Sequence, residues 1–196
     1  MDSGSGRSAW ARAQTFDELC ELGARFIEGS LSAFPGWGGS STDEETDTQG
    51  DLLARVNRSG FLTVASQVGT PDQAGADGRL ERRRSFVAGF ARGPLAAHLA
   101  LLEEVGLVVS RHLAWQEGGD SMAVGERGDE PFLLAGHGAG PEELEIFAEW
   151  IPGPALEELA HSRFLWIVDP EWGRENHLWQ ELERSIGTAP PPPRRV

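Results

Sequence analysis

The chain of 196 residues has a single cysteine, Cys20, and contains neither lysine nor tyrosine. One cysteine excludes an internal disulfide framework and any metal site built from several cysteines. Cys20 lies in an apolar helical pattern, which is more typical of a buried, unreactive thiol than of a nucleophile. No run approaches the roughly 20 apolar residues that a membrane-spanning helix needs. Residues 1–12 carry no apolar run behind a basic region, so we expect no signal peptide and a cytoplasmic protein.

The charge is strongly one-sided, with 31 acidic and 17 basic residues and a formal net charge of −14. All of the basic residues are arginines, and arginine without lysine beside abundant alanine and glycine is typical of a GC-rich bacterial genome. Nucleic-acid binding depends on a basic surface, so this balance argues against such a partner. It is compatible with a basic protein partner, or with a small anionic ligand held by a local group of arginines.

Hydrophobic periodicity predicts one domain over residues 14–187, preceded by a flexible segment 1–13 and followed by a proline-rich, disordered tail 188–196. Residues 32–42 and 68–79 have no periodicity and are predicted to be loops. We expect helices at 15–28, 43–58, 94–105, 141–151, 154–161 and 175–186, and strands at 60–67, 82–92, 107–109, 123–126, 132–134 and 164–168. This order predicts an α/β fold with a mixed sheet covered by helices, and leaves α+β as the alternative.

The strand predicted at 60–67 has three polar side chains toward its carboxyl end, Thr63, Ser66 and Gln67. Ends of buried strands are where open α/β sheets place ligands, so these residues are candidates for binding a polar ligand by hydrogen bonds. The alternative is that they cap the strand and bond to the backbone of the following loop. We expect the main cleft of the protein at the end of this strand, where the arginines and the tryptophan described next complete its walls.

Arg82 and Arg84 belong to the densest positive charge on this acidic chain, and alternation along a strand places both on one face. Two guanidinium groups can hold a carboxylate or phosphate. The alternative is a solvated strand edge with ion pairs. Trp37 lies among glycines in the loop 32–48, and tryptophans in loops are enriched at binding surfaces, so Trp37 is a third candidate for the ligand site.

Asp169 follows the apolar strand 164–168, and Glu45 lies in the acidic run that opens the helix predicted at 43–58. A carboxylate at the end of a buried strand can serve as a general base, so both are candidate catalytic residues; the alternative for Asp169 is a helix cap. The five histidines have no metal-binding spacing, and no phosphate loop, nucleophile elbow or dinucleotide fingerprint occurs. We therefore expect neither a metal nor a cofactor.

Several segments resemble an uncharacterised family of small actinobacterial proteins. They are Asp43-Glu44-Glu45-Thr46, Asn57-Arg58-Ser59-Gly60-Phe61-Leu62-Thr63, Ser66-Gln67-Val68-Gly69 and Arg84-Ser85-Phe86-Val87-Ala88-Gly89-Phe90. The similarity spans about residues 10–115, and the Gly-Phe-Leu-Thr and Ser-Gln segments are its most specific parts. The family pattern has proline after Ser-Gln and glutamine before the arginine of the later block, where this chain has Val68 and Arg83. The resemblance implies no activity, but it implies that the strand end and the Arg84 block form one site.

Two functions follow from these residues. The first is a protein that binds a small, partly hydrophobic molecule, as a cofactor-independent tailoring enzyme of bacterial secondary metabolism with Asp169 or Glu45 as proton acceptor. The second is a non-catalytic, acidic interaction protein, such as an immunity or regulatory partner that covers a basic surface. The net charge and the loop tryptophans suit both.

Overall fold

The computed structural model describes residues 3–38, 44–75 and 77–189, apart from the side chains of residues 3–5 and 44–47. The helical elements are α1 (Ser3–Trp10), α2 (Phe16–Ile27), α3 (Glu44–Arg58), α4 (Gly93–Leu99), the 3₁₀ helix η1 (Ala100–Val105), α5 (Gly140–Ala148), α6 (Gly153–Ala160) and α7 (His177–Thr188). The strands are β1 (Phe61–Gln67), β2 (Thr70–Ala74), β3 (Leu80–Arg83), β4 (Phe86–Ala91), β5 (Val108–Leu113), β6 (Met122–Arg127), β7 (Glu130–Ala135) and β8 (Arg163–Val168).

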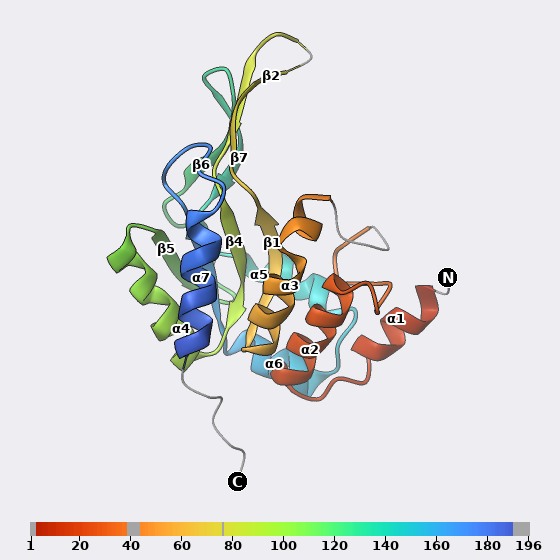
Figure 1. Cartoon of the computed structure of the whole chain (residues 1–196). Coiled ribbons are helices and arrows are strands. Elements are labelled where there is room, and N and C mark those ends of the chain that lie inside the picture. Colours follow the sequence, from red (N-terminus) through yellow and green to blue (C-terminus); the bar gives the residue numbers. More distant parts are fainter. Residues whose placement is uncertain (1–2, 39–43, 76, 190–196) are drawn as a thin grey trace.

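The strands form two four-stranded sheets, in the orders β1-β4-β8-β5 and β2-β3-β6-β7, and every pairing is antiparallel. The predicted single domain with a mixed α/β fold is confirmed. The second sheet projects beyond the helices (Figure 1), and we call it the arm. The arm is continuous with the first sheet, because β1 leads into β2 and β3 leads into β4 with two residues between each pair.

The first sheet is buried on both faces, which its alternating apolar side chains require. In β8, Phe164, Trp166 and Val168 pack with α1, α2, α5 and α6, whereas Leu165 and Ile167 pack with α3, α4, η1 and α7. Figure 1 shows these helices on the two sides of the sheet. A strand that is buried on both faces has a continuous apolar run in its sequence, and this explains why the sequence predicts β8.

The connection from α3 to β1 depends on Gly60, whose φ of 97° is in the left-handed region that glycine adopts readily. Three residues before Gly60, Asn57 fixes the start of β1. Its Nδ2 donates to Leu53 O (2.8 Å) and Thr63 Oγ1 (2.7 Å), and its Oδ1 accepts from Thr63 N (3.1 Å). Asn57 and Thr63 are both buried, so this pair satisfies polar groups inside the fold.

α2 begins at the predicted residue. Thr15 is its N-cap and accepts a hydrogen bond from Glu18 N (3.2 Å), and the helix ends before Gly29. Its buried face includes Leu19, Cys20 and Phe26. Cys20 is 2% exposed, and burial raises the pKa of its thiol above the ordinary range. This thiol is therefore protonated and shielded in the folded protein.

We expect Cys20 to resist an aromatic disulfide reagent at mildly alkaline pH in the folded protein and to react fully in guanidinium chloride. The reason is that the thiolate attacks the disulfide of the reagent and releases its aromatic thiolate, and burial disfavours the Cys20 thiolate. The released chromophore measures the reaction. Rapid, stoichiometric modification of the native chain would show an accessible thiolate and contradict this placement.

Three elements differ from the sequence prediction. Residues 68–79, predicted as a loop, contain β2, whose residues are polar and largely exposed and so lack the apolar alternation of a recognisable strand. The predicted strand 82–92 is divided into β3 and β4 by Arg84 and Ser85. Residues 3–10, within the segment predicted to be flexible, form α1, because Trp10 is fully buried against Phe34 (ring centroids 5.2 Å) and donates to Ala33 O (2.9 Å). The tail from residue 190 lies outside the described residues.

Candidate functional site

The ends of β1 and β8 lie at the same edge of the first sheet. Both strands are antiparallel to β4, so they run in the same direction, and Gln67 and Val168 align with Phe86 from either side. This topology brings Gln67, Arg84 and Asp169 together from distant parts of the sequence. With Ser85 and Arg174, we call them the strand-tip cluster.

Gln67 connects the first sheet to the arm. Its side chain is 6% exposed, and Nε2 donates to Arg84 O (2.9 Å) and to Val124 O (3.0 Å). Val124 lies in β6, so one amide group bonds both to the β3–β4 connection and to a strand of the arm. Both protons of the amide are thereby used in holding the junction.

Arg84 lies across the same junction. Its Nε donates to Pro170 O (2.8 Å), its Nη1 donates to Ala123 O (2.6 Å), and its guanidinium lies 3.9 Å from the ring centroid of Trp172. Burial lowers the pKa of Arg84, but arginine in proteins stays protonated. This cation is therefore stabilised by two carbonyl dipoles and an aromatic ring.

Arg82 lies against the same ring, 4.5 Å from the centroid of Trp172, and pairs with Glu126 at 2.6 Å. Trp172 thus contacts two guanidinium groups that alternation along the strand places on one face. The predicted pair of arginines exists as a geometric unit. What it holds in this structure is an indole ring and a carboxylate of the same chain.

Asp169 is fully buried, and its carboxylate accepts three hydrogen bonds. Its carboxylate accepts from Arg174 Nε and Nη2 (2.6 Å each) and from Glu171 N (3.0 Å). Ser85 completes the cluster: its Oγ accepts from Gly69 N (2.8 Å) and donates to Arg174 O (2.9 Å). The segment 169–174 is thereby fastened to the sheet junction, and the carboxylate has no exposed atom with which to meet a substrate.

The remaining predicted site residues lie elsewhere. Thr63 is bonded to Asn57 as described, and Ser66 is half-buried within β1 opposite Val87. Trp37 is 45% exposed in the loop after Phe34, a residue that packs among the helices, so Trp37 does not join the strand tip. Glu45 lies in the first turn of α3, and its side chain is outside the described residues.

Sequence reasoning did not identify Asn57, Ser85 and Arg174 as positioning residues. For Asn57 a signal exists, since it is a polar residue on the apolar face that Leu53 and Val56 define on α3. For Ser85 and Arg174 the only signal is their proximity in sequence to Arg84 and Asp169. Their partners come from other elements, and a single sequence does not supply that information.

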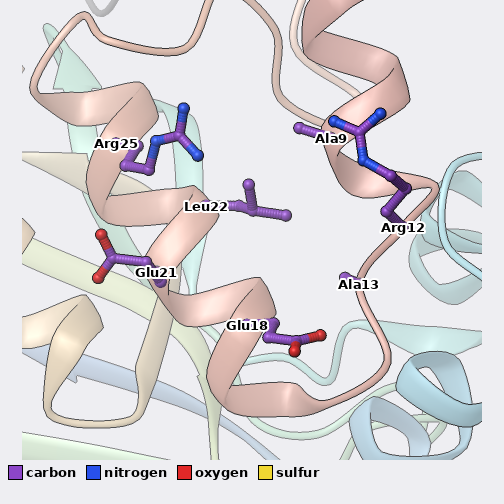
Figure 2. Close-up of a pocket in the computed structure, with 7 residues that line it drawn as sticks. All are labelled: Ala9, Arg12, Ala13, Glu18, Glu21, Leu22 and Arg25. Carbon is purple, nitrogen blue, oxygen red and sulfur yellow. The ribbon is translucent and has the colours of Figure 1, made fainter.

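Three clefts of the described structure lie away from the strand tip. One of about 280 Å³ lies between α1 and α2 (Figure 2), one of about 460 Å³ between the ends of α3 and α7, and one of about 240 Å³ between η1 and α7. None of these three is lined by a predicted site residue. Among the residues that the structure describes, no three histidine, cysteine or acidic side chains are grouped to hold a metal ion. Within the same residues, no helix is long and apolar enough to cross a membrane.

Comparisons with known proteins give a family but no activity. The model of a family described as a domain of unknown function matches residues 5–189. A stretch of 60 residues is 33% identical to Methylenetetrahydrofolate reductase 1 of Schizosaccharomyces pombe, covering 31% of this chain but 10% of the reductase. Because so little of the reductase is matched, the similarity supports no specific reaction.

Proposed function

Because this chain belongs to the DUF6919 family, a domain of unknown function that matches residues 5–189, we propose its function from its own geometry. We propose that it is a non-catalytic interaction protein. Its β7 edge pairs with an extended segment of a basic protein partner.

The observation that carries this proposal is the exposed apolar surface of β7. β7 is an edge strand of the arm, hydrogen-bonded to β6 on one side, and among the described residues no other strand pairs with it. Phe132 is 49% exposed and Leu134 is 45% exposed, two positions apart on this strand. Unpaired backbone groups beside alternate apolar side chains are the features that strand addition uses for affinity and specificity.

The charge around β7 indicates the chemistry of the partner. Asp129 and Glu130 are exposed at its beginning. Near its other end, the loop that carries Glu117 is hydrogen-bonded to the segment that follows β7, through Gly138 N to Gly118 O (2.8 Å) and Gly140 N to Gln116 O (3.1 Å). With a net charge of −14 on the whole chain, this edge suits a basic segment.

Arginines near β7 offset part of this acidity, because Arg79 pairs with Glu130 at 3.0 Å. Arg127 and Arg83 both pair with Glu81, at 2.9 Å each, and the Arg83 guanidinium lies 5.9 Å from the ring centroid of Phe132. The edge is also protected from uncontrolled pairing with further copies. Pro131 removes one backbone donor, and irregular pairing around Gly125 interrupts the ladder.

The catalytic alternative has less support. A tailoring enzyme with Asp169 as proton acceptor needs that carboxylate to reach a substrate, and Asp169 is fully buried in its bonds to Arg174 and Glu171. The amide of Gln67 and the guanidinium of Arg84 are likewise bonded within the chain. The actinobacterial origin, the cytoplasmic location and the role as an immunity or regulatory partner remain predictions.

We expect selection of a displayed random-peptide library on the full-length protein to enrich basic peptides with apolar residues at alternate positions. Leu134→Arg should weaken the binding of these peptides by about 30-fold or more. It places a cation where an apolar side chain of a basic ligand packs, and it removes an apolar contact of about 2 kcal/mol. Titration calorimetry measures the affinity. The matched control is Leu101→Arg, which changes an equally exposed leucine on η1 and should leave the affinity unchanged. Absence of enriched basic peptides, or enriched peptides that bind Leu134→Arg as tightly as the parent, would refute the proposal.

A further inference from the structure

The cleft between α1 and α2 contains two arginines whose charges are not used by the fold. The cleft is lined by Ala9, Arg12, Ala13, Glu18, Glu21, Leu22 and Arg25. Figure 2 shows Leu22 between the two helices, with the Arg25 and Arg12 guanidinium groups on opposite sides of the gap and Glu18 toward the connection between the helices. The two cations therefore come from different elements and face the same hollow.

Neither guanidinium has a hydrogen bond or ion pair with any residue that the structure describes, in contrast to most arginines of this chain. Arg58, the last residue of α3, bonds both Glu21 and Glu28, and Arg92 pairs with Asp17 and Glu158. On a chain with nearly twice as many acidic as basic residues, two arginines that line one cleft without a partner among the described residues are unexpected. Their N–H groups are donors that an anionic ligand can use.

The carboxylates of the cleft are already bonded to other groups. Glu21 accepts from Arg58 Nε (3.0 Å) and Nη2 (3.3 Å), and Glu18 Oε2 accepts from Gln14 N (2.5 Å). Within the described residues they consequently form no hydrogen bond with Arg12 or Arg25, whose N–H donors stay free for a ligand. They do remain negatively charged, so they oppose a doubly charged anion such as phosphate more strongly than a singly charged carboxylate.

The floor of the cleft is apolar. Ala9, Ala13 and Leu22 lie between the charged residues; Ala13 and Leu22 are 4% and 7% exposed, so they form a packed apolar floor against which a small apolar ligand body can lie. The volume of about 280 Å³ is just below the range of about 300–1,000 Å³ that drug-sized ligands occupy, so the ligand is small. Planar guanidinium groups are suited to binding carboxylates with two parallel hydrogen bonds.

We propose that this cleft is a binding site for a small organic carboxylate with an apolar body, whose carboxylate lies between Arg12 and Arg25 and whose body covers Leu22. The site is independent of the proposed β7 interface, because it is formed by α1, α2 and their connection and not by the arm. It gives this chain a small-molecule ligand at a place other than the predicted strand tip.

The test is a titration of the isotopically labelled full-length protein with phenylacetate, followed by amide chemical shifts. We expect saturable changes centred on residues 9–25. Two compounds serve as controls. Phenylacetamide has the same apolar ring without the charge, and inorganic phosphate has charge without the ring. Each should bind about tenfold more weakly or not at all.

Variants separate the site from nonspecific charge effects. Arg12→Gln and Arg25→Gln should each weaken phenylacetate about tenfold, whereas Arg111→Gln, an exposed arginine on β5, should not change it. Circular dichroism verifies that each variant is folded. Equal binding of phenylacetate and phenylacetamide, no saturable change in residues 9–25, or unchanged affinity in both cleft variants would overturn the proposal. Loss of peptide binding in Leu134→Arg has no bearing on these outcomes, so the two proposals fail separately.

Discussion

Replacing Gly89 with alanine is expected to lower the free energy of unfolding by about 3 kcal/mol, the largest effect that we predict for a single methyl group in this chain. Gly89 lies in the central strand β4, opposite the irregularity between Thr63 and Ala65 in β1. A Cβ atom at this position would overlap the carbonyl oxygen of Leu62 and lie 2.8 Å from Thr63 Cα. Both are backbone atoms of a buried strand, so no side chain can rotate to make room. Urea denaturation measures the change.

The matched control is Gly187→Ala near the end of α7, where the glycine is exposed and an added Cβ meets no atom within 4 Å. That variant should change the free energy of unfolding by less than about 1 kcal/mol, because alanine there loses no space and favours the helix. Equal unfolding free energies for Gly89→Ala and the parent would mean that β1 and β4 are not as closely apposed as described.

The second large effect is expected at the strand tip, where Asp169→Asn should destabilise the fold by about 3 kcal/mol. The variant keeps the size of the side chain but turns one acceptor toward Arg174 into a donor and removes the charge from a buried pair. Arg174 is 40% exposed and can turn to water, which keeps the cost below that of isolating a fully buried cation. Denaturation of the single and double variants in a cycle with Arg174→Gln measures the coupling.

This change also separates a structural role of Asp169 from a catalytic one. We expect the folded fraction of Asp169→Asn to bind the selected basic peptides with the affinity of the parent. The exposed aspartate on α3, Asp51, gives the control Asp51→Asn, which should leave both stability and affinity unchanged. An Asp169→Asn protein of parental stability that has lost its binding activity would place Asp169 in a functional site instead.

Much of the fold can be predicted from local patterns. β8 is a continuous apolar run, α2 has a capping residue at Thr15, and the helix ending at Gly106 stops where a φ of 86° requires glycine. These signals depend on residues close in sequence. β2 has no such signal, because its five residues, Thr-Pro-Asp-Gln-Ala, are stabilised by pairing with β3 and not by an apolar face.

The strand tip shows what a sequence leaves undetermined. The prediction that the end of β1 and the Arg84 block lie together agrees with the direct bond from Gln67 Nε2 to Arg84 O, and Asp169 joins them through the order of strands. Whether such residues bind a ligand depends on whether their hydrogen-bonding groups are already used. In this fold they are used by one another and by the segment 169–174, and that outcome depends on contacts between residues as far apart as Ser85 and Arg174.

We assign a structural role to the strand tip and a binding role to the β7 edge. Amide hydrogen exchange of the full-length protein, with and without a saturating selected basic peptide, tests this division most directly. Strand addition to β7 forms new backbone hydrogen bonds along the exposed edge, whereas the strand-tip cluster already has its bonds in the free protein. We predict slower exchange in residues 130–135 and no change around Gln67, Ser85 and Asp169. Protection at the strand tip with none along β7 would contradict the account.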